Sequence, residues 1–283
     1  MFGIFLLASS SFFSEIGVSL GKEEVARRKE NIYTYGFLSL CLSTIVFFLI
    51  ALLRGQFLFS LDSLPTLVPR IILEILQAYV IVKAVTTADR STFGFLRVLT
   101  IPLLLLVDLT LGYSLSINQI IGSGILTLSI LFLFLNHGLR SNGIGLVLFS
   151  ALNAVITISL FKYDITHFNS VEVEQGIIQI ILLIFFALMA WRVNRQNPLR
   201  LLGKPLFFFQ SLSQAIAGVL VSFGYSFIPA SVAASVERST AVFFSLLSGN
   251  RYFHEKKFAQ KLLAFLLLAI GFMFLSGFPF LPS

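Results

Sequence analysis

Apolar runs, each about as long as the 20 or so residues that a helix needs to cross a bilayer, recur along the whole chain between short polar connections. The runs are continuous rather than alternating, which favours helices over the strands of a barrel. Hydrophobic residues make up 57% of the chain and charged residues 12%, whereas a soluble domain carries about 25% charged residues. The sequence therefore predicts an all-α polytopic membrane protein.

The apolar runs predict ten transmembrane helices. Several connections between them are very short, and two of them, Ala88–Asp89 and Ile228–Pro229, are too short for anything but an antiparallel hairpin. The predicted helices are Met1–Gly21, Ile32–Leu53, Thr66–Thr87, Arg90–Leu111, Ile117–Leu135, Asn142–Phe161, Val171–Trp191, Pro205–Phe227, Ala230–Gly249 and Phe258–Leu275.

The two halves of the chain, residues 1–140 and 141–283, predict a repeat of five helices each. The shift that lays Arg97 on Arg238 also lays Ser9 on Ser150, Arg54 on Arg195 and Gln119 on Gln260. A competing shift lays Arg90–Thr92 on Arg238–Thr240, but it aligns the helix ends less well. Because five is odd, the second half would enter the membrane from the opposite side, as in the 5+5 inverted-topology repeats of secondary transporters.

Lys and Arg residues gather in the connections after the odd-numbered helices, and only Arg54, Arg70 and Lys162 lie toward the other side. Positive residues favour the cytoplasm. We therefore expect a multi-pass protein of the cell inner membrane whose two termini face away from the cytoplasm. The acidic residues of the first connection, Glu23, Glu24 and Glu30, weaken this bias because they fit an ordinary solvated charge run.

Arg97 and Arg238 each lie about eight residues into a predicted helix, or roughly 12 Å from its end. Both should thus lie near the middle of the membrane. An arginine presents a planar, permanently charged fork that suits a carboxylate or phosphate, so two of them facing one cavity favour an anionic substrate. The alternative is an internal ion pair that stabilises the bundle, for example Arg97 with Glu237.

Three glutamates at membrane depth, Glu15, Glu74 and Glu237, are candidates for proton coupling. A desolvated carboxyl group has a raised pKa and can carry a proton near neutral pH. For Glu15, which lies near the end of its helix, an interfacial contact with Lys22 is the alternative. Asp108 lies near the end of the fourth predicted helix, where it can reach the interface.

Neutral polar residues extend the candidate substrate site. Gln210 and Gln214 are four residues apart and share one helix face, and Gln77 is a third candidate. Such groups either line a polar cavity or join helices by hydrogen bonds. The candidate substrate-binding residues are Arg97, Arg238, Glu237, Glu74, Gln77, Gln210 and Gln214.

The segment His254–Ala264, followed by Gly271, resembles the end of the repeat in EamA-like transporters of the drug/metabolite transporter superfamily. Ala241–Leu247 is similar to the family's segment before that loop, and Thr87–Thr92 and Thr100–Pro102 look like the equivalent parts of the first half. Two features depart from the family: Ala241 stands at its helix-nine proline, and its members often have cytoplasmic termini. The resemblance implies a helical transporter without ATP, in which the fifth and tenth helices lie outside the central cavity.

Several function classes lack a signature. No Gly-rich phosphate loop is present, the three histidines are isolated, and Cys41 is the only cysteine, so no cofactor or metal is expected. The basic residues that give the net charge of +7 lie at helix ends rather than on one soluble face, so they do not indicate binding to nucleic acid. We expect a non-enzymatic secondary transporter of small metabolites such as amino acids or organic anions, surrounded by lipid and coupled to protons or a counter-substrate. The alternatives are a proton-coupled multidrug or cation exporter, a lipid-modifying membrane enzyme and a non-transporting scaffold; the oligomeric state is not predicted, because lipid-facing and partner-facing apolar surfaces are alike.

Overall fold

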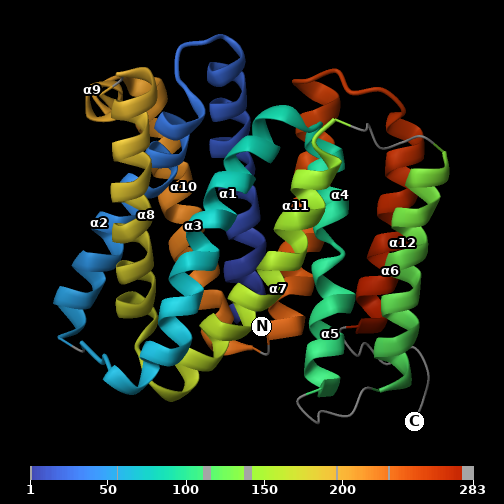
Figure 1. The fold of residues 1–283 in the computed structure, drawn as a ribbon. Helices are drawn as coiled ribbons and strands as arrows, with labels where there is room; N and C mark the ends of the chain where they lie inside the picture. The colour runs from blue at the N-terminus through green and yellow to red at the C-terminus, as the bar shows by residue number, and fades with distance from the viewer. Residues whose placement is uncertain are drawn as a thin grey trace.

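The computed structural model describes residues 2–55, 57–110, 116–136, 142–195, 197–228 and 230–275. Within these ranges every regular element is a helix (Figure 1). The helices are α1 (Phe2–Ala26), α2 (Ile32–Arg54), the short 3₁₀ helix η1 (Leu61–Ser63), α3 (Leu64–Thr87), α4 (Arg90–Arg97), α5 (Thr100–Thr110), α6 (Ile117–Leu135), α7 (Ile144–His167), α8 (Val171–Asn194), α9 (Pro198–Leu202), α10 (Pro205–Phe227), α11 (Ala230–Arg251) and α12 (Phe258–Leu275).

The ten apolar runs of the sequence all form helices, and most ends lie within a few residues of the prediction. Local capping explains some of these ends. The side chain of Asn31 accepts hydrogen bonds from the backbone N–H groups of Tyr33 and Thr34 at 2.8 and 2.9 Å, which satisfies two free donors at the start of α2. Gly55 ends the same helix in the left-handed conformation, at φ 62°.

The fourth predicted helix, Arg90–Leu111, is broken into α4 and α5 rather than continuous. The backbone N–H groups of Val98 and Leu99 turn to carbonyls three residues back, at 3.1 and 3.2 Å. Pro102 accounts for the break, because it has no N–H to donate to the carbonyl of Val98 and its ring crowds that turn. The break comes directly after Arg97.

Six stretches of helix are long and apolar enough to cross a membrane: Phe2–Ala26, Ile32–Arg54, Arg90–Val107, Ile144–His167, Val171–Val193 and Pro205–Phe227. Ile120–Leu135 and Phe258–Phe274 are shorter apolar helices. The remaining long helices, α3 and α11, contain the charges Arg70, Glu74, Lys83, Glu237 and Arg238. This composition fits a multi-pass integral membrane protein.

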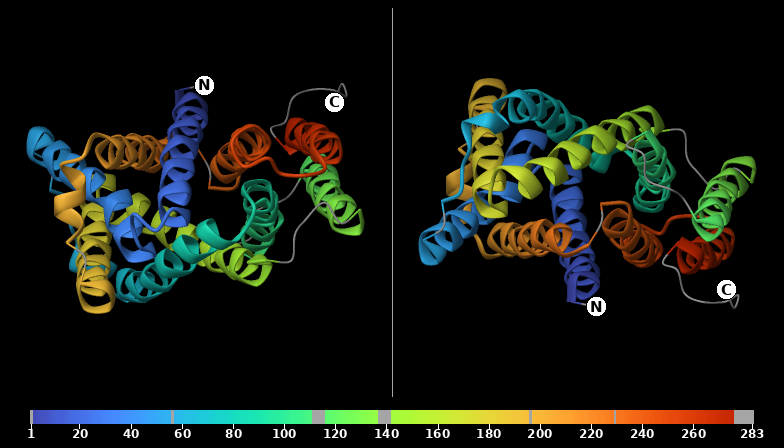
Figure 2. Two further views of the ribbon diagram at one scale, coloured as in Figure 1. Left: turned by 90° about the horizontal axis from the view of Figure 1, so that it is seen from above. Right: turned by 90° about the horizontal axis from the view of Figure 1, so that it is seen from below.

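The helices run up and down in alternation, so the connections that follow α1, α3, α8 and α11 lie at one end of the bundle, the upper end in Figure 1. Helix α1 packs most extensively on α10 and also on α11, whereas α7 packs on α3 and α4. Helices α2 and α8 pack together, as do α6 and α12. Viewed along the bundle, the α6–α12 pair stands at one edge (Figure 2).

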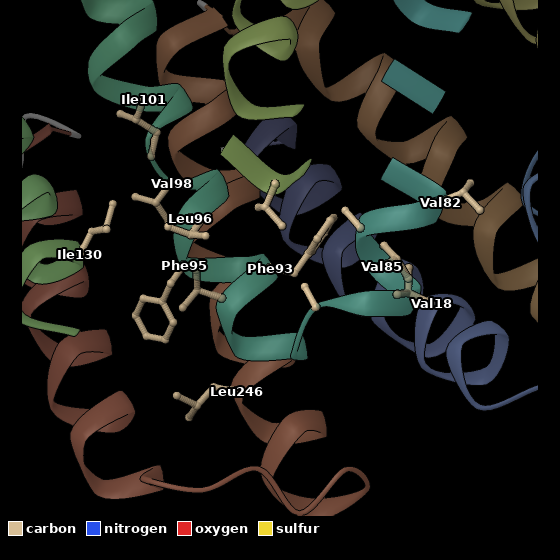
Figure 3. Close-up of a cluster of buried hydrophobic side chains, with 14 of the residues drawn as sticks. Val18, Val82, Val85, Phe93, Phe95, Leu96, Val98, Ile101, Ile130 and Leu246 are labelled. Carbon is tan, nitrogen blue, oxygen red and sulfur yellow. The ribbon is translucent and has the colours of Figure 1, made fainter. Parts of the chain in front are cut away.

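The largest buried apolar cluster joins α4 to its neighbours and holds the candidate site in place. Phe93, Phe95 and Leu96 of α4 pack with residues of α3, α6 and α11, among them Val85, Ile130 and Leu246 (Figure 3). Burying such side chains contributes roughly 1.5–3 kcal/mol each in water, but between helices in lipid close packing takes over this role. Helix α4 is thus fixed on several sides next to Arg97.

Candidate functional site

Two adjoining cavities lie inside the bundle. The first has a volume of about 340 Å³ and is lined by α1, α2, α3, α4, α8, α10 and α11. The second, of about 190 Å³, is lined by α3, α4, α7, α8, α10 and α11 and reaches Arg70, Phe161 and Tyr225. None of the described lining residues comes from α6 or α12. The residues that line both cavities are Glu74, Gln77, Ile81, Arg97, Val221, Glu237 and Arg238.

The two predicted arginines thus line the same space, from α4 and α11. The Nη1 atom of Arg238 donates to Oε1 of Glu237 at 2.7 Å, and the hydroxyl of Tyr225 donates to Oε2 at 3.0 Å. The guanidinium group of Arg97 forms no hydrogen bond and no ion pair with the other residues that the structure describes, and its Nε atom is buried without a partner. The internal pair therefore forms at Arg238, and the alternative pair of Arg97 with Glu237 is not formed.

Glu74 and Gln77 reach the cavities from α3, one turn apart. Glu74 lies 3.7 Å from Nε of Arg70 and keeps 21% of its side chain exposed. Gln77 accepts a hydrogen bond from the amide of Asn153 at 3.0 Å and donates to the backbone oxygen of Ser150 at 2.9 Å. Gln77 therefore joins α3 to α7 and lines the cavity at once.

Glu15 lines the larger cavity but is held by an ion pair with Arg90. Nε and Nη2 of Arg90 reach its two carboxylate oxygens at 3.1 and 2.7 Å, and the hydroxyls of Ser19 and Ser248 also donate to it. The interfacial partner expected from the sequence, Lys22, instead donates to the backbone oxygen of Ala88. This two-point contact ties α1 to α4 and α11 above the cavity.

The Glu15–Arg90 pair continues into the α11–α12 connection through Glu255. The backbone N–H of Arg90 donates to Glu255 at 2.5 Å, the hydroxyl of Ser91 donates to it as well, and Nζ of Lys261 lies 3.0 Å away. Burial alone would raise the pKa of Glu255, but the bond from Ser91 and the charge of Lys261 bring this pKa below its ordinary value. Glu255 therefore stays ionised and holds the start of α4.

Gln210 and Gln214 separate, although they share a helix face. Gln214 lines the larger cavity and donates to the backbone oxygen of Ser14 at 3.2 Å. Gln210 lies outside both sets of lining residues and donates to Glu30 at 3.3 Å. Burial raises the pKa of Glu30 to about 8, against the hydrogen bond from Gln210, and the Glu24 carboxylate adds to the rise. Gln210 thus joins α10 to the α1–α2 connection and is not part of the cavity lining.

A second buried ion pair lies near the starts of α3 and α8, at the other end of the bundle. Nη1 of Arg70 lies 2.5 Å from Oε1 of Glu174, and both side chains are almost fully buried. Glu174 also accepts from the amide of Asn169 at 2.6 Å, and Asn169 in turn accepts from the backbone N–H of Ser60 at 3.0 Å. The Arg70 guanidinium lies 4.6 Å from the ring centroid of Phe161. This network joins α3 and α8 to the connections beside them.

The sequence did not identify the roles of Arg70, Arg90 and Glu174. One signal was present for Arg90: it precedes Arg97 by seven residues, close to two helical turns, so both lie on one face. Arg70 and Glu174 carry no comparable signal. Among the described residues, no group of three His, Cys, Asp or Glu side chains is arranged to hold a metal. The side chains of Asp108 and Gln119 lie outside the described residues.

Comparison with known proteins gives no assignment. No family model matches the sequence, and no curated protein is detectably similar to it.

Proposed function

We propose that the chain is a secondary active transporter of small metabolites that carry an anionic group, such as organic anions or amino acids. The observation that carries this proposal is the position of Arg97, which lines both cavities and whose guanidinium group has no hydrogen-bonding or ion-pairing partner among the described residues. A charge without a partner at membrane depth costs several kcal/mol, with estimates of about 3 upward. An anionic solute bound at Arg97 offsets this cost.

The proposed mechanism is alternating access between two five-helix repeats of inverted topology, with ten membrane crossings. The packing supports it. In the proposed repeat α1, α2, α3 and α6 correspond to α7, α8, α10 and α12, and α4 together with α5 corresponds to α11. The contact of α1 with α10 therefore corresponds to that of α7 with α3, and the contact of α1 with α11 corresponds to that of α7 with α4 and α5. The pairs α2–α8 and α6–α12 map onto themselves. In such repeats the substrate site lies between the halves near the midplane, which is where we expect Arg97 and Arg238.

We place this transporter among the EamA-like members of the drug/metabolite transporter superfamily. The segment His254–Ala264 and the absence of α6 and α12 from the cavity lining support this placement. We also propose an inner-membrane location with both termini away from the cytoplasm, because the connections richest in Lys and Arg share one end of the bundle.

A proton-coupled exporter of cationic compounds is the second candidate. Glu74 favours it, because this carboxylate lines both cavities and its nearest cation, Arg70, is engaged by Glu174 at the shorter distance of 2.5 Å. A cationic solute would then bind at Glu74. A non-transporting scaffold predicts that the buried charges pair internally without facing a cavity. It is less well supported, because Arg97, Glu237 and Arg238 line both cavities.

Transport by purified protein in proteoliposomes tests these proposals. Pools of amino acids, organic acids, nucleotides and cationic dyes are offered with and without a pH gradient. We expect uptake of an anionic or zwitterionic pool that is lost in Arg97→Gln and retained in Glu23→Gln, an exposed control. Movement of dyes alone, lost in Glu74→Gln, would favour the exporter. If folded protein moves none of the pools under any gradient, the transporter proposal is wrong.

A further inference from the structure

The ring of Phe93 is shared by two cations. The guanidinium carbons of Arg90 and Arg97 each lie 5.2 Å from its centroid. The helix explains this arrangement, because residues three and four apart are surface neighbours, and Phe93 follows Arg90 by three and precedes Arg97 by four. Both contacts fall within the roughly 6 Å over which a ring face attracts a cation.

The two cations that share the ring have different tasks. Arg90 belongs to the Glu15–Arg90 pair and is the first residue of α4, next to the α3–α4 connection at the upper end of the bundle in Figure 1. Arg97 lines both cavities without an ion-pair partner among the described residues. Phe93 itself is 6% exposed and is fixed in the apolar cluster of α4. A rigid aromatic face therefore stands between the proposed substrate site and the ion pair at the cavity's end.

Among the described residues, no ring other than that of Phe93 lies against two cations. Phe161 lies against Arg70, and its other aromatic neighbour is Tyr225, whose ring centroid is 6.3 Å away in an edge contact. Tyr225 then reaches Glu237 through its hydroxyl group. Phe161 thus contacts one cation, which makes it a matched control for Phe93.

We propose that Phe93 is a positioning residue that couples the occupancy of Arg97 to the Glu15–Arg90 pair. This inference rests on the proposed function, since it assigns the occupancy to an anionic substrate. A ring face attracts cations electrostatically, so Arg90 and Arg97 compete for it and also repel each other. An anion that engages Arg97 removes both effects. Arg90 then moves toward Phe93 and away from Glu15, and the upper end of the cavity opens.

Cysteine labelling tests this coupling without a substrate. In a Cys41→Ser background, Ser39→Cys reports the larger cavity and Ser222→Cys the smaller one. Each serine hydroxyl donates to a carbonyl of its own helix. The protein is held in lipid nanodiscs, so that both faces are reached by a charged, membrane-impermeant methanethiosulfonate. The rate of modification measures how often each cavity opens.

Arg97→Gln mimics the occupied state because it removes the competing charge. We expect it to accelerate labelling of Ser39→Cys by a factor between about 2 and 30, the range that corresponds to a cation–π contact. Phe93→Leu should abolish this acceleration, whereas Phe93→Tyr, which keeps a ring, should retain it. Phe161→Leu should leave the acceleration unchanged. Thermal unfolding of each variant confirms that it is folded.

Three results would overturn the coupling. The first is that Arg97→Gln accelerates labelling of Ser39→Cys equally with and without Phe93→Leu. The second is that Arg97→Gln leaves this labelling rate unchanged. The third is that Arg97→Gln also accelerates labelling of Ser222→Cys, which indicates a loosened bundle. The proposed function fails separately, if no solute moves in proteoliposomes while the labelling response persists. Transport that requires Arg97, without any labelling response, would retain the transporter and remove only the role of Phe93.

Discussion

Arg238 donates a hydrogen bond to Glu237, its neighbour in the chain, at 2.7 Å, and this pair lines the same cavities as Arg97, which has no ion-pair partner in the described part of the chain. Two arginines that look equivalent in the sequence therefore have different tasks. Arg238 has an internal counter-ion, so its removal leaves a carboxylate without its cation. The guanidinium group of Arg97 has no ion-pair partner among the described residues, so its removal breaks no ion pair there.

This difference predicts opposite effects of two matched substitutions. Arg238→Gln should lower the free energy of unfolding by on the order of 3 kcal/mol, because breaking a buried pair leaves a charge uncompensated. Arg97→Gln should leave stability unchanged or raise it, since an unpaired charge is removed. Unfolding in detergent, monitored by circular dichroism, measures both. Equal destabilisation by the two variants would mean that Arg97 also has an internal partner.

The buried pair of Arg70 and Glu174 predicts strong coupling between the two residues. Arg70→Met should cost about 3–5 kcal/mol, because it leaves Glu174 buried without a counter-charge. Glu174→Gln should cost less, because Glu74 still lies 3.7 Å from Nε of Arg70. The double variant should be less destabilised than the sum of the single variants. A double-mutant cycle on thermal unfolding measures this difference. Additive effects would show that the 2.5 Å contact contributes no interaction energy.

The positions of the helices were predictable, because the apolar runs are long and their ends are marked by polar residues such as Asn31. The break after Arg97 was not predicted, although Pro102 gave a local signal for it. Apolar content alone does not distinguish one helix from two successive shorter ones that lie nearly in line.

The central charges could also be predicted, since Arg97, Glu237 and Arg238 interrupt otherwise apolar helices. Their partners could not. Arg90 meets Glu15 from 75 residues away, and Arg70 meets Glu174 from 104 residues away. Such pairs depend on which helix faces meet, and one sequence records the composition of each face but not its neighbour.

Glu15 provides a test of proton coupling against a structural role. Its two-point contact with Arg90 holds α1 against α4, so Glu15→Gln should destabilise the fold by about 3 kcal/mol or more. The pH dependence of transport should be unchanged, because the contact with Arg90 gives Glu15 a structural role. Uptake measured across a series of pH gradients checks this. Loss of gradient dependence in a stable Glu15→Gln protein would instead make Glu15 a proton carrier.

Glu30 predicts how stability depends on pH. Burial raises its pKa in the folded state from 4.5 to about 8. Below 4.5 both the folded and unfolded states are protonated, whereas between 4.5 and about 8 only the unfolded state loses the proton. The contribution of Glu30 to stability therefore falls as pH rises through this window, by at most about 1.4 kcal/mol per pH unit.

Glu30→Gln should remove this dependence, because the amide keeps the hydrogen-bonding shape without titrating. The melting temperature in detergent, followed from about pH 5 to about pH 9, should therefore fall less steeply for the variant than for the wild type. Glu23→Gln, at an exposed position two turns earlier, should follow the wild type. Parallel curves for all three proteins would mean that the carboxyl group of Glu30 is hydrated, and that Gln210 joins α10 to the α1–α2 connection without excluding water.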